Sequence, residues 1–200
     1  MLKIYDISQE VFGCAVFPGD PKPEKKVMMK ISDGEVCNLS AFSMCAHNGT
    51  HVDAPLHFID GKNSIDRVDL DRLIGPAYVA DHAGPILRED AEQILEDAKK
   101  SGNGAEERIL VRGKAYLTAE GAKVFAERRI KLFGNESQTV GPEDAPMEVH
   151  LIMLGAEIVL LEGIRLSRAE SGTYLLNAAP LNLGGAEGAP CRAVLLREET

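Results

Sequence analysis

The chain has 200 residues, of which 44% are hydrophobic and 26% are charged, values that are ordinary for a soluble globular protein with one sizeable core. Its 22 basic and 31 acidic residues give a net charge of −9, and Lys and Arg form no cluster, so we expect neither nucleic acid nor a membrane as a partner. The first ten residues do not resemble a signal peptide, no apolar run approaches the length of a membrane span, and four scattered cysteines indicate reduced thiols. We therefore predict one cytoplasmic domain over residues 1–200.

The first half of the chain reads mainly as β-strands. Asp33 and Gly34 form a strong turn signal between two of them and predict a β-hairpin. A polar loop with two prolines precedes this hairpin at residues 19–26. The strands predicted in this half are residues 3–8, 27–32, 35–47 and 76–81.

Helices and strands alternate from residue 88 onward. The first helix is acidic early and basic late, as a helix dipole favours, and Thr118 and Pro146 are typical residues at the start of the next two. The predicted helices are residues 88–100, 118–128 and 146–156, and the predicted strands are residues 108–112, 130–134, 157–163, 172–183 and 191–198. This alternation predicts a partly parallel β layer covered by helices, and the β-rich ends of the chain predict an additional sheet.

Three of the five histidines lie in the stretch HNGTHVDAPLH, which runs from His47 to His57. Pro55 argues against a helix in this stretch. Side chains alternate in an extended segment, so one side would carry the metal-binding side chains and the other, mainly apolar side would face the core. The side chains that would share the first side are His47, His51, Asp53 and His57.

Two neutral imidazoles and one carboxylate are a standard ligand set for Zn²⁺ or Mn²⁺ in hydrolytic sites. We predict His47, His51 and Asp53 as this set, because three protein ligands leave coordination positions for water. His57 lies about 13 Å of extended chain beyond Asp53 and needs the bend that Pro55 can provide to approach the ion. This placement suits a general base better than a metal ligand.

A second metal position requires further ligands, and His150 and Glu162 are the candidates, with Asp53 bridging both ions. His150 lies in the predicted helix 146–156, and Glu162 directly follows the apolar run 158–161. A buried carboxylate is costly unless it is paired or bound to a metal. Spacing alone leaves an alternative open for each residue. His150 could be a half-buried helix residue, and Glu162 could cap a neighbouring turn. His82 has no ligand partner nearby and is expected to be either solvated or structural.

Residues 47–58 resemble the H-x-G-T-H-x-D-x-P-x-H motif of the metal-dependent cyclase-like hydrolases, a family that includes bacterial kynurenine formamidase and isatin hydrolase. The FPGDP stretch at 17–21 resembles that family's aromatic-Pro-Gly-Asp element, and residues 172–196 look like its closing strands. The resemblance implies a single α/β domain of the swivelling β/β/α type, with mixed β-sheets and flanking helices. It also implies homodimers or homotetramers whose active sites are built partly by the neighbouring subunit.

The same resemblance assigns roles to the candidate residues. It implies two ions of Zn²⁺ or Mn²⁺ per subunit and His57 as the catalytic histidine. The first ion would be held by His47, His51 and Asp53, and the second by Asp53, His150 and Glu162. Members related to isatin hydrolase have Gln at the position of Glu162, so the carboxylate favours the two-metal pattern. Phe17 replaces a tryptophan that is common in formamidases, and residues 133–144 depart from the formamidase pattern.

We therefore predict an enzyme that hydrolyses a small-molecule amide, as an arylformamidase does, with metal-activated water and with His57 as general base and acid. One alternative is a hydrolase of lactones or cyclic amides, and another is a metal-dependent cyclase or dehydratase that uses the same groups. A protein that only binds a metal or a ligand is disfavoured, because binding alone does not require a general base.

Overall fold

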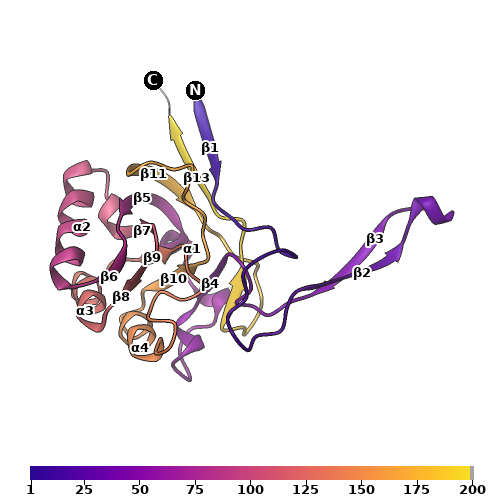
Figure 1. The fold of residues 1–200 in the computed structure, drawn as a ribbon, viewed down its shortest axis with the longest axis horizontal. Helices are drawn as coiled ribbons and strands as arrows, with labels where there is room; N and C mark the ends of the chain where they lie inside the picture. Colours follow the sequence, from indigo (N-terminus) through magenta and orange to yellow (C-terminus); the bar gives the residue numbers. More distant parts are fainter. Residues whose placement is uncertain (199–200) are drawn as a thin grey trace.

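One mixed sheet of nine strands runs through the protein in the order β1-β13-β11-β5-β7-β9-β10-β4-β12 (Figure 1). The computed structural model describes residues 1–198. Strands β5, β7, β9 and β10 pair in parallel, and the strands on either side of this block pair antiparallel. The nine strands are β1 Leu2–Asp6, β4 His51–Asp53, β5 Ile74–Asp81, β7 Arg108–Arg112, β9 Leu132–Asn135, β10 Val159–Glu162, β11 Gly172–Asn177, β12 Gly188–Pro190 and β13 Val194–Glu198.

Three helices cover one face of the parallel block (Figure 1). The predicted cap at Thr118 is confirmed, because its hydroxyl accepts a hydrogen bond from Gly121 N at 3.1 Å. Within residues 1–198, no helix is long and apolar enough to cross a bilayer. The helices are α2 Arg88–Ser101, α3 Ala119–Arg128 and α4 Met147–Gly155, with a short α1 at Leu70–Leu73, and the small parallel pair beside them is β6 Gly84–Ile86 with β8 Ala115–Leu117.

Two apolar clusters pack on opposite faces of the sheet. Phe125 of α3 and Phe133 of β9 are fully buried in the cluster between the helices and the strands. The second cluster, which includes Tyr174 of β11, takes side chains from nearly every strand and is enclosed by the curl of the sheet itself. Neighbouring residues of β10 point into different clusters, Leu160 toward the helices and Leu161 into the curl. This alternation is typical of a strand that is buried on both faces.

The predicted α/β fold with a mixed sheet and flanking helices is confirmed. The expectation of a separate sheet from the chain ends is wrong, because β1, β13 and β11 continue the same sheet beyond β5. A sheet that curls buries an inner face against its own strands, so no second independent sheet is needed to cover it. The parallel block matches the alternation of helices and strands in the sequence.

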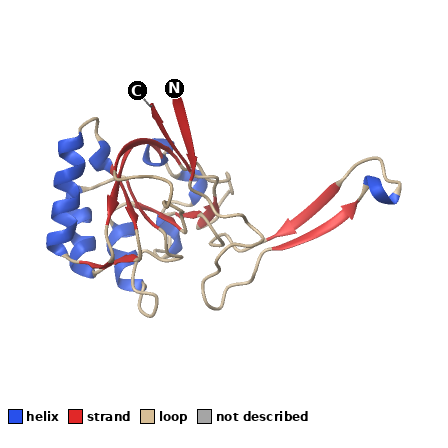
Figure 2. Ribbon diagram, turned by 45° about the horizontal axis from the view of Figure 1, so that its top comes forward, coloured by secondary structure: helices blue, strands red, loops and turns tan. Residues whose placement is uncertain are grey.

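Strands β2 (Glu24–Met29) and β3 (Leu39–Ser43) form a separate hairpin that projects away from the body (Figures 1 and 2). The hairpin was predicted, but the connection is longer than Asp33-Gly34 and spans residues 30–38 with a 3₁₀ turn at Ile31–Asp33. Asn38 Oδ1 accepts a hydrogen bond from Ile31 N at 3.0 Å and closes this connection. The large apolar side chains exposed on the hairpin are Val27, Met28, Ile31, Val36, Leu39 and Phe42.

Candidate metal centre

The pairing of β4 with β10 brings three of the candidate ligands onto one face of the sheet. Glu162 lies opposite His51, and Leu160 lies opposite Asp53. Residues directly opposite one another in a sheet point to the same side, so both pairs face the helices with Leu160. Val52 points the other way, into the cluster enclosed by the curl. A three-residue strand thus presents His51 and Asp53 on one face and anchors itself through Val52 on the other.

The stretch from His47 to His57 is not one extended segment, contrary to the sequence-based expectation. Only His51–Asp53 forms a strand, and a turn precedes it. Gly49 in that turn has φ of +66°, and a Cβ at this position would lie 2.9 Å from Cys14 Cβ. A glycine is therefore required there for both conformation and space. Pro55 begins the 3₁₀ turn Pro55–His57, which supplies the bend expected to carry His57 back toward the cluster.

Helix α4, which covers this face of the sheet, contributes His150. Its Nε2 lies 3.2 Å from Glu162 Oε1 and 3.6 Å from Asp53 Oδ2. Its Nδ1 lies 2.8 Å from Pro146 O, one turn earlier in the chain, which fixes the ring with Nε2 toward the carboxylates. Glu162 Oε1 also accepts a hydrogen bond from Val140 N at 2.8 Å. His150 and Glu162 therefore meet as the sequence spacing suggested. His150 is buried rather than half-buried, whereas Glu162 both faces His150 and holds the backbone of a neighbouring loop, as its alternative proposed.

His51 is held in the same manner by a backbone carbonyl. Its Nδ1 lies 3.1 Å from Gly49 O, and its Nε2 lies 3.4 Å from both Asp53 Oδ1 and Glu162 Oε2. Gly49 O also accepts a hydrogen bond from Gln138 Nε2 at 2.7 Å. The turn at residue 49 thus orients His51, and the loop that carries Gln138 supports that turn.

His47 completes the cluster with its ring turned the other way. Its Nδ1 lies 2.8 Å from Asp53 Oδ1, and its Nε2 lies 3.3 Å from Glu187 Oε1. A Cβ at Gly188 would lie 2.7 Å from His47 Cε1, so the glycine makes room for the ring. Glu187 was not predicted as a member of this group. The sequence offers one hint of its position, because Gly188 directly follows it and is the glycine that makes room for His47.

The charges of the cluster balance one another in a buried environment. Burial opposes protonation of His51 and His150, but hydrogen bonds and charge interactions with Asp53 and Glu162 outweigh it and raise the pKa of each imidazole to about 10. Burial likewise disfavours ionisation of Asp53, but contacts with the three imidazoles hold its pKa well below the ordinary value. The two carboxylates therefore stabilise the protonated form of the imidazoles, and the imidazoles stabilise the ionised form of Asp53.

The donor atoms fit divalent metal ions. Two groups of three side chains, which share Asp53, each offer donor atoms within 4.8 Å of one another. Two of the donor atoms that face the centre of the cluster, His51 Nε2 and Asp53 Oδ2, are buried with no hydrogen-bond partner within residues 1–198. Imidazole nitrogen and carboxylate oxygen are ligands that Zn²⁺ and Mn²⁺ both accept. The two groups are His47, His51, Asp53 and Asp53, His150, Glu162.

His57 lies beside the cluster rather than within it. Its ring stacks on that of His47 with 3.9 Å between the centroids, and 6.1 Å separates it from the ring of His150. Burial, together with the neighbouring imidazoles, lowers the pKa of His57 despite the attraction of Asp53 and Glu162. The imidazole is therefore neutral near pH 7 and able to accept a proton. His82 lies elsewhere, with Nε2 3.1 Å from Pro85 O, as a structural histidine would.

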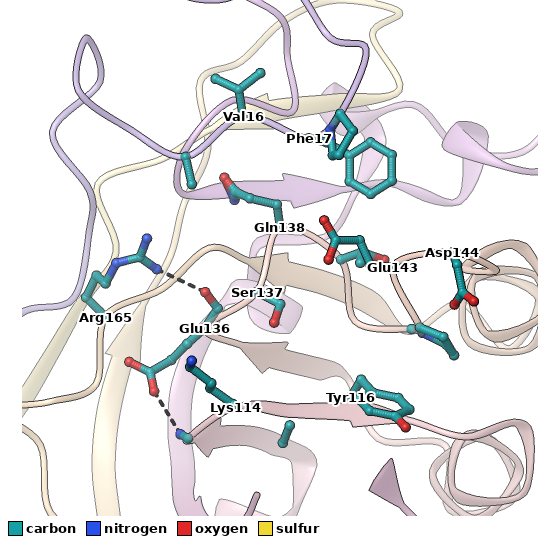
Figure 3. Close-up of a pocket in the computed structure, with 17 residues that line it drawn as sticks. Val16, Phe17, Lys114, Tyr116, Glu136, Ser137, Gln138, Glu143, Asp144 and Arg165 are labelled. Atoms are coloured by element: carbon teal, nitrogen blue, oxygen red, sulfur yellow. Dashed lines mark hydrogen bonds between the residues drawn. The ribbon is translucent and has the colours of Figure 1, made fainter. Parts of the chain in front are cut away.

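A cavity of about 860 Å³ opens at the carboxyl ends of β7 and β9 (Figure 3). Phe17 and Tyr116 contribute aromatic walls, and Lys114 and Arg165 contribute positive charge. Gln138, which supports Gly49, also lines it, so one loop borders both the cavity and the metal ligands.

Comparison with known proteins agrees with this geometry. The family model described as putative cyclase matches residues 5–142. Kynurenine formamidase of Bacillus anthracis is 33% identical over 96% of this chain and 97% of its own length, and that of Salinibacter ruber is 31% identical over 97% of both. Isatin hydrolase A of Labrenzia aggregata, solved with benzyl benzoate bound, superposes with a TM-score of 0.86 at 21% identity over 99% of this chain and 94% of that one. The chain therefore belongs to the cyclase-like family of metal-dependent hydrolases.

Proposed function

We propose that the protein hydrolyses the C–N bond of a small amide, as an arylformamidase does, with divalent metal ions bound at the cluster. The observation that carries this proposal is the pair of three-ligand groups that share Asp53, with His57 stacked at their edge. Similarity to two kynurenine formamidases over nearly the full chain supports an amide as the substrate.

The proposed site holds two ions of Zn²⁺ or Mn²⁺. Each group offers one or two imidazoles and at least one carboxylate, which leaves coordination positions for water and substrate. The buried Asp53 carboxylate has two oxygens directed at different imidazoles and so is suited to serve both ions. An ion bound there lowers the pKa of water toward about 7 and polarises a carbonyl group.

His57 is the proposed general base and acid. The neutral imidazole takes a proton from the water that attacks the amide carbonyl. It then returns this proton to the amine nitrogen as the C–N bond breaks, so the products are a carboxylic acid and an amine. Burial keeps its pKa below the ordinary histidine value, which favours the first of these transfers near neutral pH.

The cavity in Figure 3 is the proposed position of the substrate's larger portion. Its volume of about 860 Å³ lies in the range typical of small-molecule sites. Phe17 and Tyr116 offer surfaces for an aromatic ring. The lining carries charges of both signs, from Lys114 and Arg165 and from the acids Glu136, Glu143 and Asp144, so it offers partners for polar groups of the substrate. The loop between this cavity and the metal ligands contacts both, through Gln138 and Val140.

We further propose that the protein is a homodimer or homotetramer assembled through the β2–β3 hairpin. An isolated two-stranded hairpin is marginally stable in water, and this one exposes apolar side chains on both strands. A second copy of the chain is the proposed cover, because the hairpin reaches well beyond its own body (Figure 2). The four free cysteines suit the reducing cytoplasm, where we place the protein.

Metal exchange combined with a substrate panel tests the proposed function. The purified protein is stripped with a chelator, reloaded with Zn²⁺ or Mn²⁺, and assayed on an N-formyl arylamine, on isatin and on a simple lactone. We expect formamide hydrolysis that is lost on stripping and restored by either ion. Preference for isatin or the lactone would favour the cyclic-substrate alternative. Elimination without net addition of water would favour a dehydratase, and tight ligand binding without turnover would contradict an enzyme.

A further inference from the structure

Each imidazole of the metal cluster presents one nitrogen to Asp53 and leaves the other nitrogen pointing outward. For His51 and His150 the outward atom is Nδ1, which meets a backbone carbonyl at 3.1 Å and 2.8 Å. His47 is reversed, because its Nδ1 lies 2.8 Å from Asp53 Oδ1 and its Nε2 points outward. No backbone carbonyl of residues 1–198 serves this Nε2, which is buried without a hydrogen bond.

Glu187 is the carboxylate that stands at this outward nitrogen. Its Oε1 lies 3.3 Å from His47 Nε2, and its side chain is 45% exposed. Strand β12 places it there, because Gly188 pairs with Asp53 across the sheet. The backbone of Glu187 is also held in place, because its carbonyl oxygen accepts a hydrogen bond from Ala54 N at 2.9 Å. Residues 187 and 188 are thus bound to the strand that carries Asp53 and to Ala54, the residue after it.

We propose that Glu187 is a positioning residue that accepts the Nε2 hydrogen of His47 and so fixes the tautomer in which Nδ1 faces the ion. This inference rests on the metal binding in the proposed function. A carboxylate behind a metal-bound imidazole holds the ring in place and strengthens its donor nitrogen. Glu187 would thus orient the ring of His47, as the carbonyl oxygens of Gly49 and Pro146 orient the rings of His51 and His150.

The reversed ring gives a direct spectroscopic test. Nitrogen-15 NMR of labelled histidine side chains in the Zn²⁺-loaded protein distinguishes the metal-bound nitrogen from the protonated one. We expect His47 to bind through Nδ1 and to carry its hydrogen on Nε2, with the opposite arrangement for His51 and His150. A Zn²⁺-loaded protein in which His47 binds through Nε2 would overturn the inference.

Metal affinity measured by competition with a chelator gives the second test. Glu187→Ala should weaken Zn²⁺ binding by roughly 10- to 100-fold, the usual cost of removing such a partner. Glu187→Gln keeps an acceptor oxygen and should lose less, while Glu92→Ala, an exposed acid on α2, should bind as the wild type does. Unchanged affinity in Glu187→Ala would remove the role while leaving the proposed function intact. A wild-type protein that takes up no Zn²⁺ would contradict both.

Discussion

The metal centre and the β2–β3 hairpin are opposite in construction. At the centre, side chains from β4, β10, α4 and the segment before β12 converge, and four of the five proposed ligands are buried. The hairpin pairs only with itself among residues 1–198, and its large exposed apolar side chains are between 47% and 90% exposed. The chain thus gathers the proposed metal ligands within one body, whereas its projecting arm presents apolar side chains to solvent. The comparison teaches that the proposed metal binding and the proposed assembly draw on different segments of the chain and can be tested separately.

Removing the carboxylate shared by both ligand groups should have the largest effect. Asp53→Ala leaves each group with two ligands, so we expect both ions and nearly all turnover to be lost. The loss should exceed the roughly 100-fold that removing an outer partner costs. Elemental analysis checks the metal content, and circular dichroism checks that the chain remains folded. Full metal occupancy in this variant would refute the assignment of Asp53.

Removing His57 should separate binding from catalysis. We expect His57→Ala to keep both ions and to lose turnover by about 10²–10⁴, the usual contribution of general acid–base catalysis. His82→Ala is the matched control, because His82 is a partly buried histidine that contacts Pro85 O outside the cluster. Wild-type turnover in His57→Ala would exclude His57 from the reaction.

Lysine substitutions on the exposed apolar side chains of the hairpin should disrupt the proposed oligomer without affecting the metal centre. Replacing Val27, Ile31 and Val36 together with Lys should convert the oligomer to monomer, as measured by sedimentation. The metal content should stay the same, because these residues belong to the β2–β3 hairpin, whose strands pair only with each other among residues 1–198. Surface substitutions also change the free energy of unfolding little, typically within ±0.5 kcal/mol each. An unchanged oligomer mass would show that the interface lies elsewhere.

Metal binding should release protons from the centre. The pKa values of His51 and His150 are raised to about 10 without a metal, so both imidazoles hold protons at pH 7. An imidazole must be neutral to bind a metal ion. Loading should therefore release roughly two protons, one each from His51 and His150, and the affinity for the metal should rise with pH. Calorimetry in two buffers of different ionisation enthalpy measures this number. Loading without proton release would contradict the charge balance.

The sequence predicted the parts of this molecule that depend on local pattern. The helices at 88–101, 119–128 and 147–155 follow from capping, charge order and apolar spacing. Alternation also placed His51 and Asp53 on one face correctly, because those residues do form a strand. His47 also reaches Asp53 as expected, but through a turn at Gly49 with a positive φ and not through an extended segment.

Other features depend on pairings between distant segments and were not predictable from local pattern. Glu187 reaches His47 only because β12 adds to the sheet beside β4, and no spacing rule joins positions so far apart. The continuity of the terminal strands with the main sheet has the same origin, since it depends on pairing between β5 and β11. The motif itself was visible because its ligands lie close together in the chain.

The central claim is that one carboxylate joins two metal positions in a single buried cluster. Anomalous X-ray diffraction at the zinc edge, from crystals of the Zn²⁺-loaded protein, measures this directly. We predict two peaks on either side of Asp53, one beside His47 and His51 and the other beside His150 and Glu162. Peaks away from these side chains, or no peak at all, would contradict the account.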